Sequence, residues 1–124
     1  MAKLFIIIGS LSMSISVALG ALGAHALKEK LSEKLLATFK TGVEYQLYHS
    51  LALIAVGILL LYFKKGALFN WSGYLFIAGI LLFSGSLYLL ALASAKWAGP
   101  ITPLGGLSFI VAWLLLALAV WKAA

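Results

Sequence analysis

The residues best suited to chemistry in this chain are its two histidines, His25 and His49. An imidazole can carry a proton near neutral pH or ligate a metal, and two imidazoles can hold a haem iron. His49 ends the segment Tyr45-Gln46-Leu47-Tyr48-His49, in which Tyr45 and His49 share one face of a helix. Glu44 is the carboxylate nearest to His49 in the sequence. Proton or ligand handling and a sparse metal or haem site are therefore alternatives to histidines that only hydrogen-bond their neighbours.

Serine, tyrosine and threonine side chains interrupt the later apolar segments at Ser84, Ser86, Tyr88 and Thr102. In a membrane, such groups commonly hydrogen-bond between helices. The chain contains no cysteine, which excludes disulfides, thiolate metal sites and cysteine nucleophiles. No set of nucleophile, base and orienting group can be read from the remaining polar residues. We therefore predict neither an enzyme nor a bound cofactor.

The composition is that of a membrane protein. Of 124 residues, 65% are hydrophobic and 10% are charged, whereas soluble domains average about 25% charged residues. A chain this short cannot bury so much apolar surface in its own core. The net charge of +6 comes from lysines at the ends of apolar runs, where they anchor to anionic headgroups. Lipid is the predicted partner and nucleic acid is not, because no basic patch contains interleaved aromatic residues.

Four apolar segments are long enough to cross a bilayer as helices, at residues 4–24, 45–63, 71–93 and 104–121. The sequence predicts one all-α membrane domain over residues 1–124. Residues 26–43 differ from these spans. Their apolar residues are spaced by four and form one face of a helix, while the opposite face is charged, as in a short amphipathic helix at the membrane interface. Cleavage of the first segment as a signal peptide is the alternative, although the apolar run exceeds the usual length of such a core.

Local signals place the expected ends of these helices. Ser32 is expected to divide the amphipathic stretch in two, and Gly42 is expected to end it. Lys64-Lys65-Gly66 stops the second span. Asn70 and Ser72 are candidate caps for the third helix, and Thr102-Pro103 for the fourth, with threonine as the cap and proline in the first turn.

Four spans place both termini on one side of the membrane, called side one here. Side one carries Lys3, Lys64, Lys65 and Lys122, and side two carries Lys28, Lys30, Lys34, Lys40 and Lys96. The two lysine counts are too similar for the positive-inside rule to decide the orientation. The basic start and the Lys64-Lys65 pair slightly favour cytoplasmic termini.

Alternation of the helices brings one set of polar residues together in the side-two half of the bundle. This polar cluster consists of His25, Glu44, Tyr45, Gln46, Tyr48, His49, Ser84, Ser86, Tyr88 and Thr102. An exposed ion pair with Lys40 is the alternative for Glu44. Small residues predict close helix packing at Ser12, Ser16, Gly20, Ala24, Gly85, Gly105 and Gly106.

Four ordered motifs also resemble a known family. They are Gly-Ala-Leu-Gly-Ala-His, Tyr-Gln-Leu-Tyr-His, Phe-Ser-Gly-Ser-Leu-Tyr-Leu-Leu and Thr-Pro-Leu-Gly-Gly. Together they are similar to a family of small bacterial membrane proteins catalogued as uncharacterised protein family 0382, or domain of unknown function 423. The family often has phenylalanine where this chain has Leu22. The resemblance implies a multi-pass protein of the cell membrane and brings no activity, substrate or catalytic residue.

Two functional hypotheses follow. In the first, a non-enzymatic membrane protein uses the polar cluster to pack helix ends or to bind a small ligand, lipid or partner. In the second, a small transporter or proton-coupled channel uses His25, Glu44 and His49. The second requires a homo-oligomer, because four short helices enclose little space. A membrane enzyme or haem carrier is the least supported class.

Overall fold

The protein is all-α, as the sequence predicts. The computed structural model describes residues 1–64 and 66–124, so the expected role of Lys65 in stopping the second span lies outside the described residues. The elements are α1 (Ala2–Ala24), α2 (Glu33–Phe63), α3 (Ala67–Gly79), the π-helical turn η1 (Ile80–Ser84), α4 (Gly85–Ala93), the 3₁₀ turn η2 (Lys96–Ala98) and α5 (Ile101–Ala123). Within the described ranges, four helical stretches have the length and hydropathy of membrane spans.

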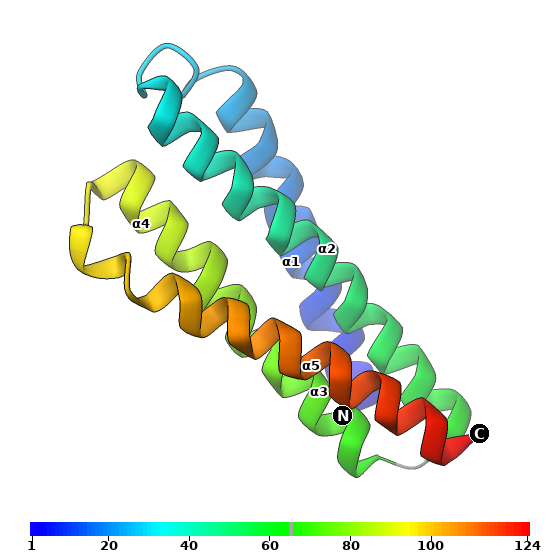
Figure 1. Ribbon diagram of the computed structural model, residues 1–124. Coiled ribbons are helices and arrows are strands. Elements are labelled where there is room, and N and C mark those ends of the chain that lie inside the picture. Colours follow the sequence, from blue (N-terminus) through cyan, green and yellow to red (C-terminus); the bar gives the residue numbers. More distant parts are fainter. Residues whose placement is uncertain (65) are drawn as a thin grey trace.

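The helices form two hairpins that pack side by side. Figure 1 shows α1 antiparallel to α2, and the continuous stretch from α3 to α4 antiparallel to α5. Both chain termini lie at one end of the bundle, opposite the connector between α1 and α2 and the turn η2 (Figure 1). Helix α2 makes most of the contacts between the hairpins. It therefore positions any site formed by both halves.

Glycines allow α1 and α2 to approach closely. A Cβ atom at Gly9 would lie 2.9 Å from the carbonyl oxygen of Ser50, and one at Gly57 would lie 2.8 Å from that of Ala2. Ser16 belongs to the buried face of α1 together with Phe5, Gly9 and Gly23. The last two residues of the predicted row of small residues are less closely packed. A Cβ at Gly20 would make only ordinary contact with Val43, and Ala24 is exposed. The prediction that Ala24 packs is therefore wrong.

Helix α2 begins earlier than its sequence suggests. Its N-cap is Ser32, whose hydroxyl accepts a hydrogen bond of 3.2 Å from the amide of Leu35, and the helix continues through Gly42 to Phe63. The expected end at Gly42 is wrong. That glycine is buried against Tyr88, where a Cβ would lie 2.8 Å from the aromatic ring. It provides room for a neighbouring helix and does not terminate its own.

The long α2 changes the place of the amphipathic stretch. Residues 25–30 form turns, whereas residues 33–43 are the first part of α2. Phe39, Val43 and Ala91 form a small core, against which Leu27 and Leu31 pack. Part of the apolar stripe predicted to face the membrane surface is thus covered by the protein itself.

The caps predicted for the last two helices are also wrong. Helix α3 begins at Ala67 after Gly66, so Asn70 and Ser72 lie inside it. Helix α5 begins at Ile101 after Pro100, so Thr102 lies in its first turn. Ser72 and Thr102 make hydrogen bonds between helices: the Ser72 hydroxyl donates to the carbonyl oxygen of Ala112 at 2.8 Å, and Thr102 pairs with Ser86.

The glycines of the second hairpin differ in their surroundings. A Cβ at Gly105 would lie 2.7 Å from the Cα atom of Phe83, so α5 and η1 approach each other closely there. A Cβ at Gly106 would make only ordinary contact with the Phe83 ring, at 3.7 Å. A Cβ at Gly85 would meet nothing within 4 Å. The predicted close approach is wrong at Gly85, and it is tightest at Gly105.

Lys64 ends α2 in the left-handed region, with φ of 55°. Residues other than glycine adopt this conformation at a cost of about 1 kcal/mol. We expect Lys64→Gly to be more stable than Lys64→Ala by about 0.5–1 kcal/mol. Both variants lose the same charge, so the difference in their unfolding free energies in detergent reports the backbone conformation. Equal stabilities would contradict this prediction.

Candidate functional site

A closed ring of hydrogen bonds joins α1 to α2 around Gln46. The side-chain nitrogen of Gln46 donates to Ser12, with its carbonyl oxygen at 3.1 Å and its hydroxyl at 3.2 Å. The Ser50 hydroxyl lies 2.7 Å from that of Ser12 and 2.6 Å from the carbonyl oxygen of Gln46. A hydroxyl has one hydrogen and a carbonyl oxygen only accepts. The Ser50 hydroxyl is therefore the donor that the Ser12 hydroxyl and the backbone carbonyl oxygen of Gln46 share, and these contacts close the ring.

Tyr88 connects this ring to the second hairpin. Its phenolic hydroxyl donates to the side-chain oxygen of Gln46 at 2.6 Å. One turn nearer side two on α2, the Ser84 hydroxyl donates to the carbonyl oxygen of Gly42 at 2.7 Å. Gln46, Ser50 and Ser84 are all buried. The nitrogen and the oxygen of the Gln46 side-chain amide are thus both hydrogen-bonded, the nitrogen to α1 and the oxygen to the second hairpin.

The ring lies deep in the membrane-spanning part of the bundle. At 1.5 Å per residue, Ser12 is about 15 Å from the first residue of α1 and about 18 Å from the last. The expectation that Gln46 and His49 lie at the side-two end of their span is therefore wrong. It assumed a helix starting near Tyr45, whereas α2 starts at Glu33. The additional turns place Gln46 and His49 in the interior.

His49 occupies an aromatic pocket and uses both of its ring nitrogens. Nδ1 lies 2.6 Å from the carbonyl oxygen of Tyr45, and the indole nitrogen of Trp113 donates to Nε2 at 3.1 Å. Because a carbonyl only accepts and an indole only donates, these contacts define a neutral imidazole protonated on Nδ1. The ring stacks on Phe109 with centroids 3.5 Å apart. In this arrangement neither nitrogen has a lone pair available for a metal.

His25 is separate from His49. It is exposed at the C-cap of α1, whereas His49 lies at the level of Ser12, between Gln46 and Ser50 on α2. Thirteen residues of helix separate Ser12 from His25, or about 20 Å. The two histidines therefore cannot ligate one metal or haem iron in this chain. Among the described residues, no group of three histidine, aspartate or glutamate side chains is placed to hold a metal ion.

The remaining predicted cluster residues divide between the interior and the surface. Ser86 and Thr102 join α4 to α5 through hydroxyl groups 2.6 Å apart. Tyr45 is partly exposed and packs against Phe83, with ring centroids 4.5 Å apart and the planes tilted by 31°. Glu44 and Tyr48 are exposed on α2. The structure thus brings Gln46, Ser84, Tyr88, Ser86 and Thr102 into interhelical contacts, but leaves His25, Glu44 and Tyr48 outside them.

Three important partners were missed from the sequence. Ser50 completes the ring, Trp113 binds His49, and the Ser108 hydroxyl donates to the carbonyl oxygen of Leu75 at 2.7 Å. Ser12 was predicted to pack only as a small residue. The four-residue spacing of Gln46 and Ser50 was a local signal for one polar face of α2. The sequence offers no comparable signal for the contact between Trp113 and His49, because these residues are far apart in the chain.

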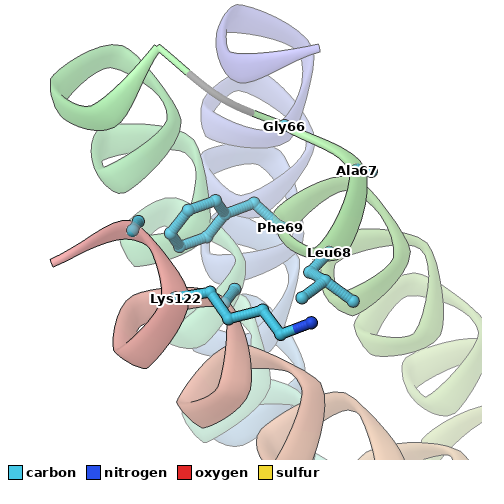
Figure 2. A pocket seen from close by; sticks show the side chains of 7 residues that line it. Gly66, Ala67, Leu68, Phe69 and Lys122 are labelled. Atoms are coloured by element: carbon cyan, nitrogen blue, oxygen red, sulfur yellow. The ribbon is translucent and has the colours of Figure 1, made fainter.

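The surface formed by the described residues has at least three recesses, one of which, of about 260 Å³, is lined by Met1, Ala2, Leu60, Lys64, Gly66 and Asn70. Another lies between the beginning of α2 and the end of α4 and has a volume of about 330 Å³; it is lined by Lys34, Leu35, Thr38, Leu90, Ser94 and Lys96. We call it the α2–α4 groove. A third, of about 190 Å³, lies between the beginning of α3 and the end of α5. Figure 2 shows Phe69 and Leu68 in its wall and the Lys122 side chain extending beside them.

Comparison with known proteins identifies relatives along almost the entire chain. The model of a family described as protein of unknown function (DUF423) matches residues 19–106. A UPF0382 membrane protein of Staphylococcus haemolyticus is 46% identical over 123 residues, covering 97% of each chain. The UPF0382 membrane protein YwdK of Bacillus subtilis is 42% identical over 120 residues, covering 97% of this chain and 98% of its own. No solved structure matches. The chain therefore belongs to the UPF0382 (DUF423) family of membrane proteins.

Proposed function

We propose that this membrane protein is non-enzymatic and acts by binding at its surface, while its buried polar cluster holds the two hairpins together. The proposal rests on the closed hydrogen-bonding of that cluster. The nitrogen and oxygen of the Gln46 side-chain amide and both ring nitrogens of His49 are hydrogen-bonded to side chains and carbonyl groups of the protein. Polar groups that a substrate would have to engage are thus already satisfied internally.

The pairing of these groups also weighs against transport, the alternative function. A proton or ion pathway needs polar groups that can exchange partners, and intramembrane ionisable residues are usual members of such pathways. His49 is instead held by Tyr45, Trp113 and the stacked ring of Phe109. His25 and Glu44, the other residues considered for a pathway, lie apart from it on the surface.

His49→Leu tests the structural role of this histidine. We expect the variant to lose about 1–3 kcal/mol of stability, because it removes two hydrogen bonds and a stacked ring. The indole N–H resonance of Trp113 is expected to move upfield and to exchange faster with solvent, since its acceptor is gone. The indole signals of the other tryptophans, Trp71, Trp97 and Trp121, are exposed internal controls.

Flux measurements in liposomes complete this test. We expect proton and monovalent-cation flux to be the same with wild-type protein, with His49→Leu and with empty vesicles. A wild-type flux above that of empty vesicles, abolished by His49→Leu in folded protein, would replace the binding function with transport. Native mass spectrometry of the same samples measures the oligomeric state. We predict that any homo-oligomer persists in the variant, because His49 faces the interior.

A further inference from the structure

The α2–α4 groove combines two lysines with an apolar floor. Lys34 belongs to the first turn of α2 and Lys96 to η2, and both are exposed. Leu35 and Leu90, from opposite walls, are partly buried. The groove therefore brings together two positive charges from segments far apart in the sequence. A ligand matching these features has an anionic head and an apolar body.

The groove lies where lipid headgroups meet hydrocarbon. Helix α4 ends at Ala93 and is followed by Ser94 in the left-handed conformation, with φ of 50°. Trp97 next to Lys96 is 66% exposed, as expected for a tryptophan in the aromatic belt of the membrane interface. Below this level the walls belong to apolar membrane spans. A lipid in the groove would thus have its phosphate beside the lysines and its chain along the leucines.

We propose that the α2–α4 groove binds an anionic phospholipid, with the phosphate between Lys34 and Lys96 and one acyl chain against Leu35 and Leu90. This inference builds on the proposed surface-binding function and names its partner. The volume of the groove, about 330 Å³, is at the lower end of the range for small-molecule sites, roughly 300–1,000 Å³. That space holds a headgroup phosphate and the first part of a chain, while the rest of the lipid remains in the bilayer.

Charge distinguishes anionic lipids from the zwitterionic lipids that surround them. A phosphatidylcholine headgroup would bring a quaternary ammonium towards two lysines, whereas phosphatidylglycerol adds no positive charge. Glu33 adjoins Lys34 at the start of α2 but does not line the groove. The recess beside Lys122 has a single lysine in its lining. It therefore lacks the pair of cations on which this selectivity depends.

The test is native mass spectrometry of protein released from vesicles of equal parts phosphatidylglycerol and phosphatidylcholine. We expect wild-type protein to retain phosphatidylglycerol preferentially. The double variant Lys34→Gln/Lys96→Gln is expected to reduce that retention about tenfold, since each lysine near an anionic surface contributes appreciably to lipid binding. The control Lys28→Gln/Lys30→Gln removes equal charge from the same connector side, outside the groove, and is expected to retain the lipid.

Competition separates a lipid site from a phosphate site. Short-chain phosphatidylglycerol is expected to displace the retained lipid, and glycerol phosphate is not, because it cannot contact Leu35 and Leu90. Equal losses in the two double variants, or equal retention of both lipids by wild-type protein, would overturn the proposal. The flux measurement is independent of this result. A wild-type flux that His49→Leu abolishes would refute the proposed function without removing the lipid site.

Discussion

Gln46→Leu is expected to destabilise the protein by about 2–3 kcal/mol, the largest effect of any single polar-to-apolar substitution in the chain. Leucine has nearly the volume of glutamine, so the change removes hydrogen bonds and creates no sizeable cavity. The lost partners are Ser12 on α1 and Tyr88 on α4. Hydrogen bonds between membrane helices average about 0.6 kcal/mol and reach about 1.7 kcal/mol. The upper values apply here because the Tyr88 hydroxyl is left without its acceptor in an apolar interior.

A double-mutant cycle separates the two sides of the Gln46 side chain. Tyr88→Phe removes only the bond to the second hairpin and is expected to cost about 1 kcal/mol. Added to Gln46→Leu, Tyr88→Phe should recover part of the loss, because it removes the hydroxyl that Gln46→Leu leaves without an acceptor. Steric trapping or reversible unfolding in bicelles measures these free energies. Additive losses in the double variant would contradict the contact between Gln46 and Tyr88.

Ser50→Ala tests how much the Ser50 hydroxyl contributes to the stability of the ring. It removes the hydroxyl that donates to Ser12 but leaves the contacts of the Gln46 side-chain nitrogen and oxygen in place. Its cost is therefore expected to be smaller than that of Gln46→Leu, at about 1 kcal/mol. A cost equal to that of Gln46→Leu would mean that Ser50, and not the amide of Gln46, dominates the ring.

The fold class and the number of spans follow directly from the sequence. Long apolar segments bounded by lysines and turn residues have only one stable form in lipid, since every backbone polar group must be paired within its own helix. Helix ends were less predictable. Gly42 reads locally as a terminator, but its role is decided by the Tyr88 ring packed against it.

The candidate site was predictable in its composition but not in its connections. Gln46, Ser84, Tyr88 and His49 stood out because polar side chains are costly inside apolar segments. Their partners depend on how far one helix slides along another, which no local pattern specifies. The sequence predicts that the second span starts near Tyr45, about three turns after the true start of α2 at Glu33. Gln46 and His49 were therefore expected at the end of a helix, whereas they lie inside it. Trp113 is far from His49 in the sequence, and only the packing of α5 against α2 brings its indole nitrogen to the imidazole.

Gly105→Ala is expected to destabilise the protein more than alanine at any other glycine, with a loss of unfolding free energy of about 3 kcal/mol or more. The added methyl group would lie 2.7 Å from the Cα atom of Phe83 and closer still to its backbone nitrogen. Backbone cannot rotate away as a flexible side chain can, so α5 and η1 must separate. Their separation also strains the nearby contact between Ser86 and Thr102. Overpacking of this kind typically costs about 1–3 kcal/mol and occasionally more.

Gly85→Ala is the matched control for this prediction. The two glycines lie on the facing helices α4 and α5, and the substitution is chemically identical. A Cβ at Gly85 meets nothing within 4 Å, and its φ of −58° is helical. Alanine is therefore expected to be neutral or to stabilise by up to about 1 kcal/mol. Thermal unfolding in one detergent compares both variants with wild-type protein. Similar losses at Gly85 and Gly105 would show that membrane helices here resist any added volume, and that the close contact between Gly105 and Phe83 does not join the second hairpin.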